Sequence, residues 1–152
     1  SSFEAMLRDA DNKLLHLTEV RSAVEAAIVA LACRRRTPED IRRLEQSLAA
    51  LMIEPDQNKQ IAIDFQFHRI LAESCRNPVY LYIMEGLAGL IRRSQQTTYT
   101  KDGLINARHG HRAILDAVIA GDEALAAEEM RQHLRNAERT LLDNLKSVPH
   151  HQ

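Results

Sequence analysis

Apolar residues recur every three or four positions along almost the whole of this 152-residue chain, and this spacing restricts its fold more than any other feature. A period of 3.6 lines apolar side chains along one face of an α-helix, whereas a half-buried strand needs alternation at every second position. Such alternation is absent, and the residues that most often interrupt helices are scarce, with five glycines and four prolines. The sequence therefore predicts an all-α chain, folded as an antiparallel bundle of about six to seven helices.

Local signals divide this pattern into separate helices. Thr37-Pro38 and Asn77-Pro78 each join an N-cap side chain to a proline at the first helical position, where the missing N–H costs nothing. Gly121-Asp122 supplies a left-handed residue that ends one helix and a cap that begins the last. We expect helix boundaries at these three places.

Other segments are assigned from the strength of the pattern. Residues 1–16 have weak apolar spacing and should form a linker or lead-in helix before a domain at 17–146, with a frayed tail at 147–152. Residues 95–103 are polar and lack an apolar stripe, so we expect the longest loop there. In the helix before that loop, the expected inward side chains are Val79, Tyr82, Ile83, Leu87, Leu90 and Ile91.

Composition narrows the class of protein. Lys plus Arg number 20 against 21 for Asp plus Glu, so net charge gives no sign of nucleic-acid or anionic-membrane binding. Cys33 and Cys75 are not in a C-x-x-C pair, which fits a reducing compartment. No apolar run approaches the roughly 20 residues of a membrane span, and the N-terminus lacks a signal-peptide pattern. We expect one cytoplasmic domain that does not bind DNA itself.

Four residues on apolar helix faces suggest a metal site in the bundle core. Asp64 and His68 are four residues apart, so their side chains leave the same face of one helix. His111 and His133 lie on the apolar faces of two other predicted helices, whereas His109 should face away from His111. Three imidazoles and a carboxylate suit a divalent transition ion, with Zn²⁺ first and Ni²⁺, Mn²⁺ or Fe²⁺ as the other candidates.

Two other interpretations stay open on the residues alone. Each histidine could be a packed core residue bonded to a backbone carbonyl, which would make the chain a metal-free interaction module. A small helical metalloenzyme acting on a carboxylate-containing substrate would need a general base besides the ligands. No H-E-x-x-H or similar motif supplies one, so we expect that the chain is not an enzyme.

The order of these elements resembles the FCD domain, the ligand-binding C-terminal domain of GntR-type bacterial transcription regulators. The resemblance runs from Leu17 to Leu142, and Arg76 departs from it where relatives often have glycine. The matching residues are Arg21 and Glu25, Asp64 to His68, Asn77-Pro78, His111 to Ile114, Ala117, Val118, Gly121-Asp122, Ala126, Met130, His133 and Leu134.

The resemblance implies a function as well as a fold. In that family, an aspartate and three histidines hold a divalent metal, a small organic acid binds beside it, and the domain forms a homodimer; the ligands here would be Asp64, His68, His111 and His133. Arg21 is the first candidate to bind the acid and Arg92 the second, because a guanidinium pairs well with a carboxylate. DNA would be bound by a winged helix-turn-helix domain that is absent from these 152 residues.

Overall fold

The computed structural model describes residues 2–147, apart from the side chains of residues 2–8, 10, 11 and 147. Within this range the chain forms six helices and no strand, so the all-α prediction is confirmed. The helices are α1 (Ser2–Arg35), α2 (Pro38–Ile53), α3 (Gln57–Ser74), α4 (Pro78–Thr98), α5 (Lys101–Ala120) and α6 (Glu123–Ser147). No described helix is long and apolar enough to cross a membrane.

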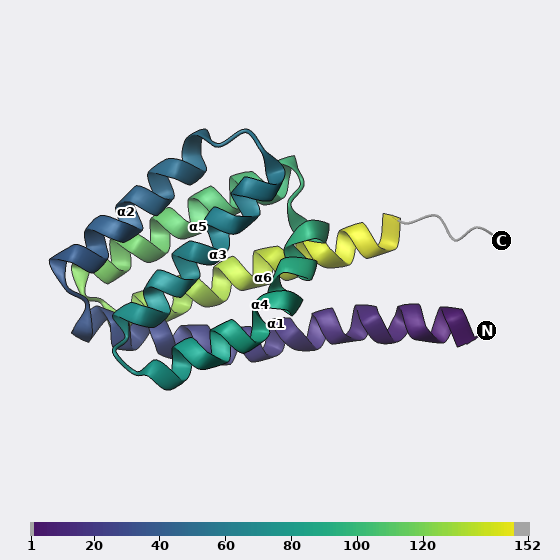
Figure 1. Ribbon diagram of the computed structural model, residues 1–152, viewed down its shortest axis with the longest axis horizontal. Helices are drawn as coiled ribbons and strands as arrows, with labels where there is room; N and C mark the ends of the chain where they lie inside the picture. Colours follow the sequence, from purple (N-terminus) through teal and green to yellow (C-terminus); the bar gives the residue numbers. More distant parts are fainter. Residues whose placement is uncertain (1, 148–152) are drawn as a thin grey trace.

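The first and last helices form one side of the bundle. α1 and α6 lie side by side and run in opposite directions, so that the start of α1 and the end of α6 project at the same end (Figure 1). α3 and α5 pack against this pair, α2 packs on α3 and α5, and α4 packs on α3, α6 and α1. The residues expected as a linker or lead-in helix continue from Ser2 without a break into the helix that follows. Of the predicted tail, residues 148–152 lie outside the described range.

The helix boundaries form for the reasons that the sequence suggests. The Thr37 hydroxyl accepts a hydrogen bond from the Asp40 amide, and the Asp40 carboxylate accepts one from the Thr37 amide, which makes a complete capping box. Asn77 caps α4 through the Val79 amide. Gly121 ends α5 with φ 72°, a left-handed conformation that glycine adopts without steric cost.

Arg76 occupies the turn between α3 and α4 with φ 58°, a region that non-glycine residues rarely adopt. This explains why glycine suits the position. Two contacts of the guanidinium help to hold the turn: Nη2 pairs with Asp40 at 2.7 Å, and Nη1 donates to the Glu73 carbonyl. The α3–α4 connection therefore keeps its shape without glycine.

The prediction of a long loop at 95–103 is wrong. α4 continues to Thr98 and α5 begins at Lys101, so only Tyr99 and Thr100 separate them. Gln95, Thr98 and Tyr99 are buried, although the segment is polar in sequence. The segment lacked an apolar stripe because its inward side chains face polar groups of the core.

The inward face predicted for α4 is also partly wrong. Leu87 is half-buried and Ile91 is buried as expected, and Met84 joins them in the core. The other four predicted inward residues are exposed: Val79, Tyr82, Ile83 and Leu90. Apolar residues lie on both sides of this helix, so periodicity alone could not identify the buried side.

Candidate metal centre

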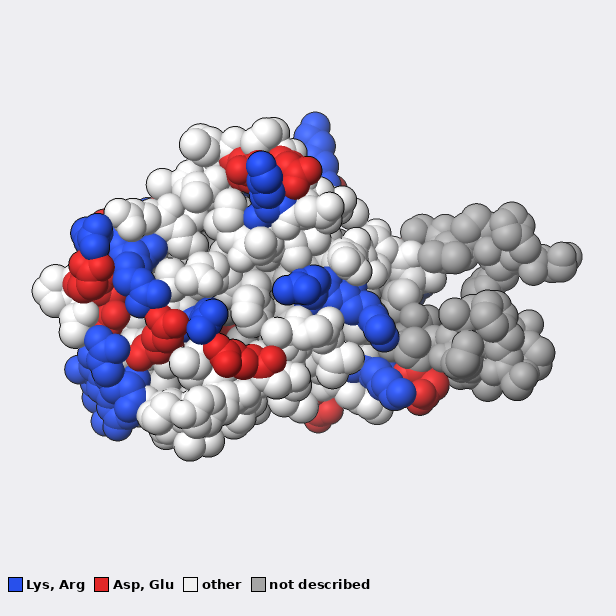
Figure 2. Space-filling model, in the orientation of Figure 1, with Lys and Arg blue, Asp and Glu red and all other residues white. Residues whose placement is uncertain are grey.

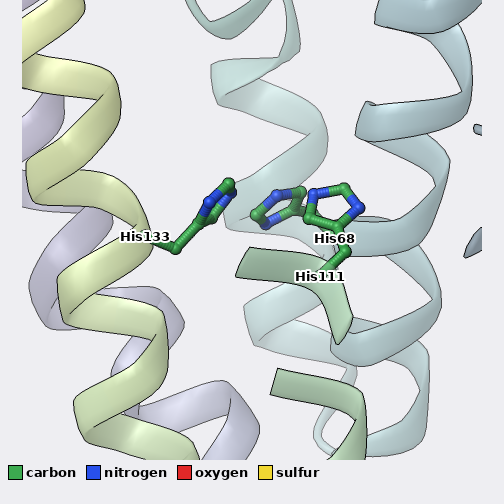
Figure 3. Close-up of side chains that lie close together, drawn as sticks. All are labelled: His68, His111 and His133. Carbon is green, nitrogen blue, oxygen red and sulfur yellow. The ribbon is translucent and has the colours of Figure 1, made fainter. Parts of the chain in front are cut away.

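Three histidines from three helices meet in the interior of the bundle. His68 comes from α3, His111 from α5 and His133 from α6, and their rings are directed toward one another (Figure 3). One nitrogen of each lies within 4.8 Å of a nitrogen of the other two. The ring centroids are 5.1, 5.2 and 5.5 Å apart. Three imidazoles around a Zn²⁺ ion with Zn–N bonds of about 2.0–2.1 Å would have centroids about 5 Å apart.

Neighbouring residues fix the orientation of these rings. Phe67 stacks on His111 with ring centroids 4.1 Å apart and planes nearly parallel. Gly110 makes room for His133, because a Cβ at this position would lie 2.4 Å from its Nδ1. The sequence contains this glycine in the middle of a helix, where its entropic cost needs a packing reason.

Two nitrogen atoms at the centre lack hydrogen-bond partners among the described residues. His68 Nε2 and His111 Nε2 are fully buried, and neither has a hydrogen-bond partner among the described residues. An unpaired polar atom in the interior is costly unless something binds it. These nitrogens and His133 could therefore hold a metal ion, and borderline-soft imidazole donors fit a divalent transition ion.

A buried ion pair from α1 lies behind His68. The Glu25 carboxylate contacts His68 Nδ1 through Oε1, and Arg21 Nε donates to Glu25 Oε2 at 2.7 Å. All three side chains are buried. A carboxylate on the far nitrogen of a metal-binding imidazole orients the ring and raises its basicity. Glu25 was predicted from the sequence to match the family pattern but not to take part in the site; the signal for that role was a charged pair four residues apart in an apolar helix.

The protonation of the histidines follows from these neighbours. Burial alone would lower the pKa of His68, but the carboxylates of Glu25 and Asp64 raise it to about 9. Burial and the nearby His68 lower the pKa of His133 to about 4, and burial holds the pKa of His111 well below its ordinary value. Burial would raise the pKa of Glu25, but Arg21 and His68 lower it to about 2. At neutral pH the imidazole of His68 is therefore charged, and those of His111 and His133 are neutral.

Asp64 lies beside two of the three histidines. Its Oδ1 is 3.4 Å from His68 Nε2 and its Oδ2 is 3.5 Å from His111 Nε2. Gln95 Nε2 donates to Oδ1 at 2.9 Å, and the Tyr99 hydroxyl donates to Oδ2 at 2.5 Å. Although burial opposes it, the nearby histidines hold the pKa of Asp64 below its usual range. Gln95 and Tyr99 were not predicted as site residues, because both fall in the segment expected to be a loop.

The two candidate arginines differ in position. Arg21 is buried and lines a small cavity of about 40 Å³ that also borders Asp64 and His133. Arg92 is exposed on α4 and does not line this cavity. His16 and His109 are exposed, as expected. The structure therefore brings Asp64 and the three histidines together, with Arg21 beside them.

The FCD domain model matches residues 16–136 of the chain. Among curated proteins, the transcriptional regulator LutR of Bacillus subtilis (strain 168) is 30% identical over 132 residues, which cover 82% of this chain and 60% of LutR. A putative L-lactate dehydrogenase operon regulatory protein of Escherichia coli (strain K12) is 30% identical over 137 residues, 86% of this chain and 52% of that protein. The chain thus spans about half to three fifths of these relatives.

A solved structure shows the same fold. The metal-free FCD domain of TM0439, a putative transcriptional regulator, superposes with a TM-score of 0.78 over 91% of this chain and 97% of that one, at 15% sequence identity. The relatives are transcriptional regulators, in agreement with the expectation that this chain is not an enzyme.

Proposed function

This chain belongs to the FCD domain family, the effector-binding domains of GntR-type transcriptional regulators, and from that membership we propose that it binds a divalent metal and a small organic acid. The observation that carries the proposal is the group of three buried histidines, two of which have a nitrogen without a hydrogen-bond partner among the described residues. Zn²⁺ is the first choice of metal, with Ni²⁺, Mn²⁺ or Fe²⁺ as alternatives, because imidazole and carboxylate suit each of them. We assign Asp64 as the fourth ligand, beside His68, His111 and His133.

The charges around the centre support an anionic effector. Arg21 and protonated His68 balance Glu25 and Asp64, so the buried group is neutral. A divalent ion in place of the His68 proton would leave a net positive charge, which attracts a carboxylate. Arg21 lines the cavity and can add a charge-assisted hydrogen bond to that carboxylate. The name of the E. coli relative points to an operon for a small hydroxy acid, L-lactate, which supports this class of ligand.

We propose that the domain acts as a homodimer through α4. Val79, Tyr82, Ile83 and Leu90 are exposed on this helix, at 58, 67, 37 and 38% of their full accessibility. Figure 2 shows an uncharged area at the lower left, over part of α4, bordered by a group of Lys and Arg side chains. Exposed apolar patches of this kind commonly mark protein interfaces. The partner that we propose for this surface is a second copy of the chain. We also propose that the regulator works in the cytoplasm and binds DNA through another domain.

The experiment is calorimetric titration of the Zn²⁺-loaded chain with small carboxylates, beginning with L-lactate. Arg21→Gln should weaken the binding of a responding acid about tenfold or more, because a charge-assisted hydrogen bond is lost. Arg92→Gln tests the second arginine, and we expect no change because its side chain is exposed on α4. Equal affinities in the native chain and the Arg21 variant would remove Arg21 from the site. The absence of binding by every acid tested would contradict an acid-sensing role.

A further inference from the structure

The cavity beside the histidines is too small for an organic acid. Its free volume is about 40 Å³, whereas pockets for small organic ligands usually measure about 300–1,000 Å³. It can hold an ion or a water molecule. An acid that binds there must therefore move part of the wall.

One part of the wall is attached to the centre by side-chain hydrogen bonds. The end of α4 and the start of α5 line the cavity with Gln95, Thr98, Tyr99 and Gly103. Gln95 and Tyr99 donate to the two oxygens of Asp64, which in turn face His68 and His111. The α4–α5 junction is thus fastened to the same carboxylate that we assign to the metal.

The α4–α5 junction is closely packed, and only two of its residues are not helical. A Cβ at Gly103 would lie 1.9 Å from the Thr98 carbonyl oxygen, so any other residue would displace this turn. Gln57 Nε2 at the start of α3 donates to the Tyr99 carbonyl at 2.8 Å. The Tyr99 ring packs in a small cluster with Leu51, Ile61 and Ala107. Two non-helical residues, Tyr99 and Thr100, are the place where the two helices can hinge.

Resting on the proposed binding of an organic acid, we propose that Tyr99 and Gln95 form a latch on Asp64 that closes the cavity, and that the acid enters when this latch opens. Opening removes two donors from the Asp64 carboxylate. The same hydroxyl and amide can then donate to the carboxylate of the acid, so one carboxylate acceptor replaces another. The two residues are therefore positioning residues for Asp64 in the closed form and binding residues in the open one.

The latch is tested by amide hydrogen exchange, followed by mass spectrometry, on the 152-residue chain without added ligand. Tyr99→Phe keeps the ring in its apolar cluster and removes only the donor. Exchange in residues 95–104 should become at least about tenfold faster, because the lost bond is to a charged acceptor. Exchange in α2 and the first half of α6 should stay unchanged. Tyr80→Phe, at a half-buried tyrosine of α4 that is not assigned to the interface, is the matched control and should change neither.

A second variant tests the same latch without touching the donor. Gly103→Ala should push the Thr98 carbonyl away and speed exchange in the same segment. If both variants leave the segment unchanged, or speed exchange equally throughout the chain, the latch is refuted and Tyr99 has a merely structural role. This result does not depend on any acid, so it is separate from a failure of the native chain to bind metal or carboxylates.

Discussion

The centre of the bundle and the surface of α4 are opposite exceptions to the usual distribution of residues. In the centre, charged and polar side chains such as Glu25, Asp64 and His68 are almost completely buried. On α4, large apolar side chains such as Val79 and Tyr82 are more than half exposed. Most residues elsewhere follow the ordinary rule, so these two regions are the informative ones.

Each exception costs free energy in the isolated chain, and binding of a further partner would offset that cost. The buried Nε2 atoms of His68 and His111, which have no hydrogen-bond partner among the described residues, favour a cation. Exposed apolar side chains favour another protein surface. The two regions are connected, because α4 ends at Tyr99, whose hydroxyl is bonded to Asp64. Metal binding in the centre and self-association through α4 therefore involve the same helix. We nevertheless expect different substitutions to affect them.

The largest expected effect concerns the buried carboxylate behind His68. Glu25→Gln keeps an acceptor for the imidazole but removes the charge, so Zn²⁺ affinity should fall about 10- to 100-fold in competition titrations with a chelator. Glu19→Gln, at an exposed position of the same helix, is the control and should bind as the native chain does. Unchanged affinity in the Glu25 variant would mean that this carboxylate does not support the centre.

The next effect is the pH dependence of stability. The pKa of His68 is raised in the folded chain, from an ordinary 6.5 to about 9. Its contribution is fully present below pH 6.5 and is lost as the pH rises through 9. Urea unfolding of the metal-stripped chain should show a decrease of about 1–3 kcal/mol between these values.

Zinc should remove this decrease, because metal binding needs the deprotonated imidazole. A His68→Gln variant without metal should also lack it. If stability in the stripped native chain were constant from pH 6.5 to 9, His68 would not be charged between Glu25 and Asp64.

The smallest effect is expected on α4. Tyr82→Lys should weaken self-association about tenfold in sedimentation experiments, since aromatic residues commonly dominate interfaces. The free energy of unfolding of the monomer should change by no more than about 0.5 kcal/mol, because the side chain is exposed. Ile53→Lys is the matched control, at an 82% exposed apolar residue of α2. Equal effects of both substitutions, or none, would show that α4 is not the interface.

The centre and the surface of α4 also differ in how much of each could be predicted from the sequence. Helix spacing and caps such as Thr37 predict the bundle, because they depend on local chemistry. Asp64 and His68 were found because a four-residue spacing fixes their shared helix face. Tyr99 was missed because its partner is 35 positions away and nothing in the polar segment 95–103 indicates a buried acceptor. The exposed side of α4 was missed because its pattern is apolar on both sides.

The most direct test of the central claim is the metal content of the purified chain after incubation with Zn²⁺ and removal of excess. His111→Ala removes one buried imidazole, and His109→Ala, two residues earlier on the same helix, removes an exposed one. We predict about one equivalent of zinc in the native chain and in His109→Ala, and almost none in a folded His111→Ala variant. No zinc in the native chain, or a full equivalent in His111→Ala, would contradict a metal centre built from these histidines.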